Sequence, residues 1–203
     1  MNDLSDLPYD HNIKFSFLDI NNMYSNIPTK EMITTLERLC ETNNLEDKTR
    51  QDILKITRII AELNYFRFQD KVYVQNEGLA MGAPTFFIFS EIYLQNPENT
   101  KIAELLLKHK FEDYFRYVDD ILIMYKEDQT SIHKVLDDFN STTPNMEFSL
   151  DKKENNKINF LDITIAKRHD SLLFEIYRKP TTTDVIIPND SCLPGEHKIT
   201  AIR

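Results

Sequence analysis

The stretch Phe115–Met124, FRYVDDILIM, places two adjacent carboxylates inside an otherwise apolar segment. This pattern predicts two strands, over 114–117 and 121–125, joined through Val118, Asp119 and Asp120. Neighbouring carboxylates in apolar surroundings repel each other unless a cation compensates their charge. A divalent-metal site is therefore one interpretation. An ordinary Asp-Asp turn between strands is the other, since Asp favours turns for conformational reasons of its own.

A second carboxylate position lies at the end of another apolar strand, predicted over 13–20 and closed by Asp19. Taken alone, Asp19 is as well explained as a helix N-cap at a strand end. Together with the hairpin, however, it would bring three carboxylates to one sheet edge. Hard oxygen ligands of this kind suit Mg²⁺ held jointly with substrate phosphates. Two such ions can clamp the attacking and leaving oxygens of an in-line phosphoryl transfer.

The rest of the chain alternates helical and extended patterns. Helices are predicted at 29–40, 46–63, 85–94 and 130–139, with a break at Asn96-Pro97 and a restart up to 109. Thr29 is the predicted cap of the first, and Ile53, Ile56, Ile59, Ile60 and Leu63 form the predicted buried stripe of the second. Strands are predicted at 65–69, 71–75, 146–150, 157–166 and 171–178, with a turn at Gln69-Asp70 and a loop at 78–84.

This element order predicts an α+β fold, because hairpins recur among the helices. The sheet should be antiparallel or mixed, with helices on one face, close to a ferredoxin-like core. The length of 203 residues fits one domain with a small appendage. We expect a loose segment over 1–12, the main domain over 13–178 and a polar tail over 179–203.

Composition excludes several classes of protein. Only 3 residues are Gly, which argues against Gly-rich phosphate loops, and the apolar run 79–90 is too short for a membrane span. Acidic residues near the N-terminus leave no visible signal peptide, so an intracellular, nuclear or cytoplasmic location is expected. The two cysteines have no zinc-site spacing and are expected to be free thiols.

The formal net charge of −9 gives no support for nucleic-acid binding by bulk charge. The charge is uneven, however. Residues 151–203 carry nine Lys or Arg against eight Asp or Glu, so the acidic excess lies in 1–150. A polyanion would have to be bound by local basic patches, most plausibly in the last quarter of the chain.

Four motifs, in order along the chain, resemble those of a reverse transcriptase palm, and more closely those of Penelope-like element reverse transcriptases. FLDINNMYSNIP at 17–28 is similar to their DVxSLYTNIP, and GLAMGAP at 78–84 to their GxAMGSP. FRYVDD at 115–120 is shared as it stands. INFLDITIAKR at 158–168, followed by YRKPTTTD at 177–184, resembles their FLDV and YRKPTHTD segments. The resemblance covers about residues 13 to 200.

The resemblance implies an RNA-directed DNA polymerase that adds deoxynucleoside triphosphates to a DNA primer on an RNA template, with Mg²⁺ or Mn²⁺ as cofactor. Asp19, Asp119 and Asp120 would be the catalytic and metal-binding residues. The implied nucleotide-binding residues are Tyr24, which would exclude a 2′-hydroxyl, and Met81, Gly82 and Pro84. Residues 160–162 would lie in the primer-grip region, and Arg178 and Lys179 would contact the nucleic-acid backbone.

The sequence also departs from the family pattern. Ala83 stands where the family has Ser, and Thr85-Phe86-Phe87 replaces the usual residues after Pro84. We expect fingers to be absent, a thumb to be absent or rudimentary, and no GIY-YIG nuclease to follow, so that the chain is a palm-centred fragment.

Alternatives stay open beside this interpretation. Tyr24 is equally explained as a core residue, and Arg178-Lys179 as a solvated basic pair. A palm-type nucleotidyl cyclase also uses carboxylates on a ferredoxin-like sheet, although the four ordered motifs disfavour it. The remaining alternative is a catalytically inactive, retroelement-derived domain that binds RNA or protein.

Overall fold

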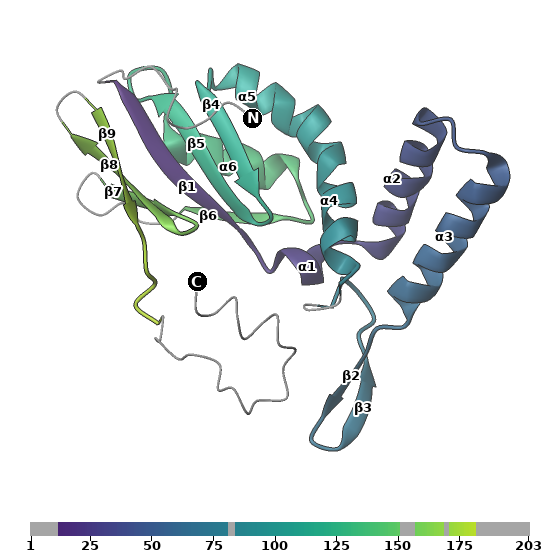
Figure 1. The fold of residues 1–203 in the computed structure, drawn as a ribbon. Helices are drawn as coiled ribbons and strands as arrows, with labels where there is room; N and C mark the ends of the chain where they lie inside the picture. Colours follow the sequence, from purple (N-terminus) through teal and green to yellow (C-terminus); the bar gives the residue numbers. More distant parts are fainter. Residues whose placement is uncertain (1–11, 81–83, 151–156, 169–170, 182–203) are drawn as a thin grey trace.

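The computed structural model describes residues 12–80, 84–150, 157–168 and 171–181 (Figure 1). Its central sheet has the strand order β4–β5–β1–β6, and every neighbouring pair is antiparallel. These strands are β1 (Ile13–Asn21), β4 (Asp113–Tyr117), β5 (Asp120–Lys126) and β6 (Glu147–Leu150). The order strand, helices, two strands, helix, strand is the β-α-β-β-α-β arrangement. The predicted α+β class is confirmed, and of the two predicted alternatives, antiparallel or mixed, the central sheet is antiparallel.

Among the described residues, seven helical segments lie between these strands. They are α1 (Met23–Asn26), α2 (Thr29–Thr42), α3 (Asp47–Glu62), α4 (Phe86–Pro97), the π-helical η2 (Glu98–Ile102), α5 (Ala103–Lys108) and α6 (Ile132–Thr142). None of the described helices is both long and apolar enough to cross a membrane.

The two faces of the central sheet bury different partners, because successive side chains of a strand point to opposite faces. Leu18 and Ile20 of β1 pack with Ile121 and Ile123 of β5 in a cluster that includes helical residues of α2, α4 and α6. This face is therefore the one covered by helices, as predicted. The intervening positions on β1 and β5 face the other way.

A second, three-stranded sheet packs against that other face. It consists of β7 (Lys157–Phe160), β8 (Ile163–Arg168) and β9 (Ser171–Ile176). Phe15 and Leu122 of the central sheet share a buried cluster with Phe160 and Ile165 of the small one. The prediction of one strand over 157–166 was wrong. Leu161 adopts a positive φ of 54°, so the chain turns there and forms two strands.

Two helix predictions near α4 and α2 also need correction. The chain stays helical through Asn96-Pro97, where the predicted break is replaced by the π-helical turn η2. A π-turn lets a helix continue where Pro removes an i→i−4 hydrogen bond. Thr29 is the first residue of α2, not its cap, and the cap position is held by Pro28.

The predicted set of buried residues on α3 was wrong. The residues that are buried lie on a different face of the helix from the predicted stripe. Leu54, Thr57 and Ala61 are buried, whereas Ile56 is 57% exposed and Leu63 is 61% exposed. The helix continues into the hairpin of β2 (Tyr65–Phe68) and β3 (Lys71–Val74), which turns at Gln69-Asp70 as predicted. Every residue of both strands is exposed.

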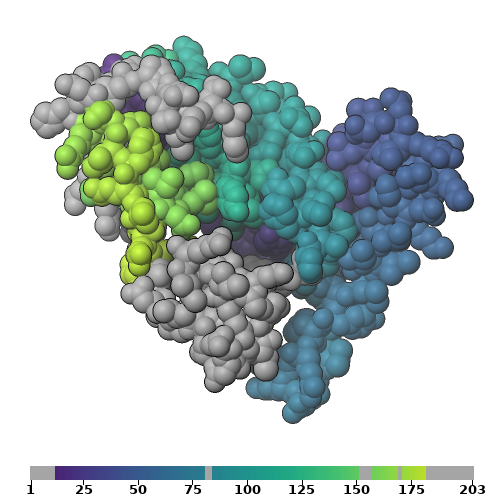
Figure 2. Space-filling model, in the orientation of Figure 1, coloured from purple at the N-terminus to yellow at the C-terminus, as the bar shows by residue number. Residues whose placement is uncertain are grey.

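We name α3, β2 and β3 together the arm. In the space-filling view the hairpin projects from the body as a separate lobe (Figure 2). The predicted segment 1–12 and tail 179–203 lie almost entirely outside the described residues.

Candidate functional site

The carboxylates of the central strands are placed by the register of β1 and β5. Asp19 lies directly opposite Asp120, and the Ile20 amide donates a hydrogen bond to the Asp119 carbonyl at 3.0 Å. Directly opposed residues of an antiparallel pair project from the same face, with Cβ atoms about 4.5–5.5 Å apart. Asp19 and Asp120 therefore share the face on which Phe17 and Leu122 are paired, which is the face away from the helices.

Asp119 occupies the turn between β4 and β5. The turn has two residues, Val118 and Asp119, and Val118 adopts a φ of 57°. A positive φ at the first central residue alone is typical of a type II′ hairpin turn. It is strained for a β-branched side chain. The sequence gives no Gly here, so the strain must be offset by interactions around the turn.

Arg116 provides those interactions from the helix-facing side of β4. Its guanidinium donates to the Val118 carbonyl at 2.9 Å. It also donates to both carboxylate oxygens of Glu91, at 2.8 and 3.0 Å, and of Glu98, at 2.5 and 2.9 Å. Two bidentate pairs satisfy a side chain that is only 8% exposed. The turn that carries Asp119 is thereby tied to α4 and η2.

Burial and hydrogen bonds to the two carboxylates act on this guanidinium in opposite directions. The hydrogen bonds prevail, so the pKa of Arg116 is raised and the group stays charged. Burial and the neighbouring Glu98 carboxylate raise the pKa of Tyr114, which donates to Glu98 at 3.2 Å. Sequence reasoning missed this cluster. A signal existed, because Glu91 and Glu98 are seven residues apart, which is two helical turns and one face.

The carboxylates act on one another electrostatically. Burial, followed by the charges of Asp119 and Asp19, raises the pKa of Asp120, and the charge of Lys179 opposes this shift. A carboxyl group whose ionised form is disfavoured by like charges gains from a cation placed between them. The charge of Lys179, a predicted nucleic-acid contact, therefore acts on Asp120.

The donor set has the chemistry that Mg²⁺ and Mn²⁺ prefer, namely carboxylate oxygens from adjacent strands. The described part of the chain contains no group of three or more His, Cys, Asp or Glu side chains gathered closely enough to hold a metal ion. Two carboxylates with substrate phosphates and water as the other ligands are a usual arrangement for Mg²⁺. Asp19 and Asp120 are the residues that would hold it, whereas the predicted meeting of all three carboxylates is not found among the described residues.

Tyr24 is half-buried in α1, beside the start of the predicted nucleotide loop. The Leu79 amide donates to the Tyr24 carbonyl at 2.7 Å. Gly78 adopts a φ of 80°, and a Cβ at this position would overlap the backbone of Ser25. This Gly is therefore required for the close approach of the loop to α1. Met81 and Gly82 lie outside the described residues, and Pro84 is exposed just before α4.

The basic pair Arg178 and Lys179 is exposed and follows β9. The Tyr177 amide donates to the Asp162 carbonyl at 2.8 Å, which anchors this segment on the turn between β7 and β8. Arg178 and Lys179 therefore follow β9 at the point where the chain is bonded to the predicted primer-grip residues 160–162. Their contact with a nucleic-acid backbone stays a prediction.

Two solved telomerase structures share this architecture, which is therefore a reverse-transcriptase-like fold. The apo telomerase of Candida tropicalis, truncated of its C-terminal domain, superposes with a TM-score of 0.57 at 13% identity, over 83% of this chain and 36% of that one. The telomerase of Candida albicans, in complex with a TWJ fragment of telomeric RNA, gives 0.59 at 16% identity, over 79% and 31%.

The chain thus spans about a third of the length of these telomerases, and identities this low show the fold alone. No protein-family profile and no curated protein matches the chain.

Proposed function

We propose that the chain is the palm of a reverse transcriptase that adds deoxynucleotides to a primer 3′-hydroxyl, and that it derives from a Penelope-like retroelement. The observation that carries the proposal is the register that sets Asp19 opposite Asp120, with Asp119 in the adjoining turn. The polymerase fold and the four ordered sequence motifs support it. RNA template, DNA primer and deoxynucleoside triphosphates are the proposed partners.

When bound, Mg²⁺ or Mn²⁺ supplies charge stabilisation for the transferring phosphoryl group. The chain's own residues perform the positioning. Asp19 and Asp120 project from one face of the sheet, Arg116 fixes the turn that carries Asp119, and Lys179 adds a positive charge near them. Catalysis of phosphoryl transfer depends mainly on such positioning and electrostatics. Tyr24, beside the 78–84 loop, is the proposed contact for the incoming sugar.

A primer-extension assay on an RNA template, in Mg²⁺ and separately in Mn²⁺, tests the proposal. We expect weak, short extension, because a chain of net charge −9 grips phosphates poorly. Asp119→Asn and Asp19→Asn should abolish the signal, and Asp113→Asn, at the far end of β4, should preserve it. Incorporation that persists in both Asn variants would contradict the proposed site. A cyclic nucleotide product would indicate a cyclase instead.

The exposed aromatic residues of the arm favour a second candidate, a non-catalytic domain that binds RNA or protein. Tyr65, Phe66 and Phe68 are all more than half exposed, a combination common at binding surfaces. This candidate predicts no extension under any metal, together with RNA or protein binding that survives Asp119→Asn.

A further inference from the structure

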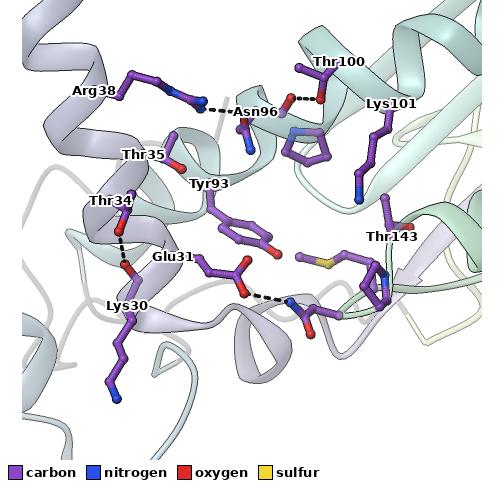
Figure 3. Close-up of a pocket in the computed structure, with 14 residues that line it drawn as sticks. Lys30, Glu31, Thr34, Thr35, Arg38, Tyr93, Asn96, Thr100, Lys101 and Thr143 are labelled. Carbon is purple, nitrogen blue, oxygen red and sulfur yellow. Dashed lines mark hydrogen bonds between the residues drawn. The ribbon is translucent and has the colours of Figure 1, made fainter.

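A cavity of about 510 Å³ lies on the helical side of the fold, away from the carboxylates (Figure 3). Its walls come from α2, from the α4–η2 junction and from the 143–146 loop between α6 and β6. None of Asp19, Asp119 and Asp120 lines it. Ligand pockets usually measure about 300–1,000 Å³, so the cavity has room for a small metabolite.

Basic side chains gather at this cavity although the chain as a whole is acidic. Lys30, Arg38 and Lys101 line it, against the single acidic residue Glu31. Within the described ranges none of the three basic groups forms an ion pair, whereas Arg50, for example, pairs with two carboxylates. Arg38 donates to the Asn96 side chain and Lys101 to the Thr142 carbonyl at 3.0 Å. Both groups retain further donors for a ligand.

A buried hydroxyl points into the same cavity. Thr35 is only 7% exposed and lines the pocket from α2, with its oxygen directed toward the interior (Figure 3). In the part of the chain that the structure describes, this hydroxyl has no hydrogen-bond partner, unlike its neighbour Thr34, which donates to the Lys30 carbonyl. A buried polar group without a partner is costly, so a ligand that accepts its hydrogen bond would be favoured.

The part of the cavity around Tyr93 and Glu31 has different polar groups, namely a phenol, a carboxylate and a carboxamide. Tyr93 projects into its middle with Glu31 beside the hydroxyl, and Asn145 donates to Glu31 at 3.4 Å (Figure 3). Burial raises the pKa of Tyr93, so its hydroxyl keeps its proton at neutral pH. The wall also includes Pro97, at the start of the π-helical turn, a feature that often marks functional positions in helices.

We propose that this cavity binds a nucleoside phosphate, either free or as one unit of a single-stranded nucleic acid, at a site separate from the carboxylates. Arg38 and Lys101, from opposing walls, together with the Thr35 hydroxyl, take the phosphate, because guanidinium, ammonium and hydroxyl donors are the usual phosphate ligands. Glu31, Asn145 and Tyr93 face the sugar or base, whose hydroxyl and amino groups need acceptors and donors. The apolar wall at Pro97 covers the rest.

Binding is tested with the full chain in EDTA, which removes the metal that nucleotide binding at the carboxylates requires. The probes are adenosine 5′-monophosphate, a short oligouridylate and inorganic pyrophosphate, each titrated by calorimetry. Arg38→Gln and Lys101→Gln should each weaken binding about tenfold or more, the loss expected for a charge-assisted hydrogen bond. Thr35→Val should weaken it less while leaving the melting temperature unchanged or higher.

The controls are Arg58→Gln and Lys134→Gln, which remove exposed charges outside the cavity, and Asp119→Asn. All three should bind the probes like the parent chain.

Binding of the oligouridylate without the monophosphate would identify nucleic acid as the source of the phosphate. Binding of the monophosphate without the oligouridylate would identify a free nucleotide. Absence of binding by every probe, or equal weakening by pocket and control variants, would overturn the proposal. The test does not depend on the proposed polymerase function, because it measures binding in EDTA and uses Asp119→Asn only as a control.

Discussion

The central sheet and the arm use the same kinds of apolar side chain with opposite results. Ile121, Leu122 and Ile123 on β5 are fully buried, because helices cover one face and the small sheet covers the other. On the arm, Ile56 and Val72 are 57% and 70% exposed. The sheet therefore completes its own core, whereas the arm presents an apolar surface with no cover among the described residues. An isolated two-stranded hairpin is marginal in water, so β2 and β3 gain little stability from their own pairing.

The same contrast separates the ion pairs of the two regions. Arg116 in the sheet makes bidentate contacts to Glu91 and Glu98 and is nearly buried, whereas Arg67 pairs with Asp70 on the exposed hairpin. A buried charge without a partner costs far more than an exposed one. Charge removal should therefore have unequal effects on the two regions.

The largest expected effect follows from Arg116→Met. The change leaves two partly buried carboxylates without their counter-charge and frees the Val118 carbonyl, so the free energy of unfolding should fall by about 3–5 kcal/mol. Arg67→Met is the matched control and should cost less than about 1 kcal/mol. Urea unfolding measures both. Equal losses of unfolding free energy in Arg116→Met and Arg67→Met would contradict the proposed difference between the two regions.

Next in size is the comparison of Ile123→Ala with Ile56→Ala. The first removes a fully buried side chain and should cost about 2–5 kcal/mol. The second removes an exposed one from a helix, where Ala has the higher helix propensity, and should change stability by less than about 0.5 kcal/mol. A large loss for Ile56→Ala, measured in the same unfolding series, would show that a partner covers the arm in solution.

Metal binding should also distinguish the two regions, because the proposed carboxylate site lies on the central sheet. Mg²⁺ or Mn²⁺ at ten times its Kd should raise the free energy of unfolding by about 1.4 kcal/mol. Asp119→Asn should remove most of this gain, whereas Asp70→Asn on the arm should keep it. Melting temperatures from calorimetry, with and without metal, measure this gain in stability. Identical melting with and without saturating metal would contradict the site.

The smallest expected effect concerns pH. Because the folded-state pKa of Asp120 is raised, the folded chain binds this proton more tightly than the unfolded chain. The free energy of unfolding therefore falls as pH rises from the ordinary carboxyl pKa through the raised pKa of Asp120. Below this pH window the carboxyl group is protonated in both states and has no effect on stability. Asp120→Asn should stabilise the chain at neutral pH, by less than about 1 kcal/mol after solvent screening, and not at pH below the window. Stability curves of both proteins against pH, without metal, measure the difference.

Much of the fold follows from local patterns. The apolar run ending at Asp19, the FRYVDD hairpin and the Gln69-Asp70 turn are visible in the chain itself, since strand periodicity and turn residues act over a few positions. These elements suffice to predict an α+β fold with an antiparallel or mixed sheet. The motif order adds the reverse-transcriptase resemblance, and the fold agrees with it at that level. The Penelope-like origin stays a prediction.

The contacts between distant groups follow from the folded arrangement and not from local patterns. The register of β1 on β5 sets Asp19 opposite Asp120 and leaves Asp119 in the turn, an arrangement that the spacing of these residues along the chain does not give. The partners of Arg116 come from α4 and η2, 25 and 18 residues away in the chain.

The amino-acid sequence predicts most of the strands and turns, because these depend on neighbours along the chain. It did not determine which apolar face of α3 is covered, since Ile56 and Leu54 are equally apolar and burial depends on what packs against each. It also did not separate β7 from β8, because the turn at Leu161 needs a backbone conformation that Leu rarely adopts on its own. Burial, register and strained turns are fixed by contacts between distant segments, and these contacts exist only in the folded chain.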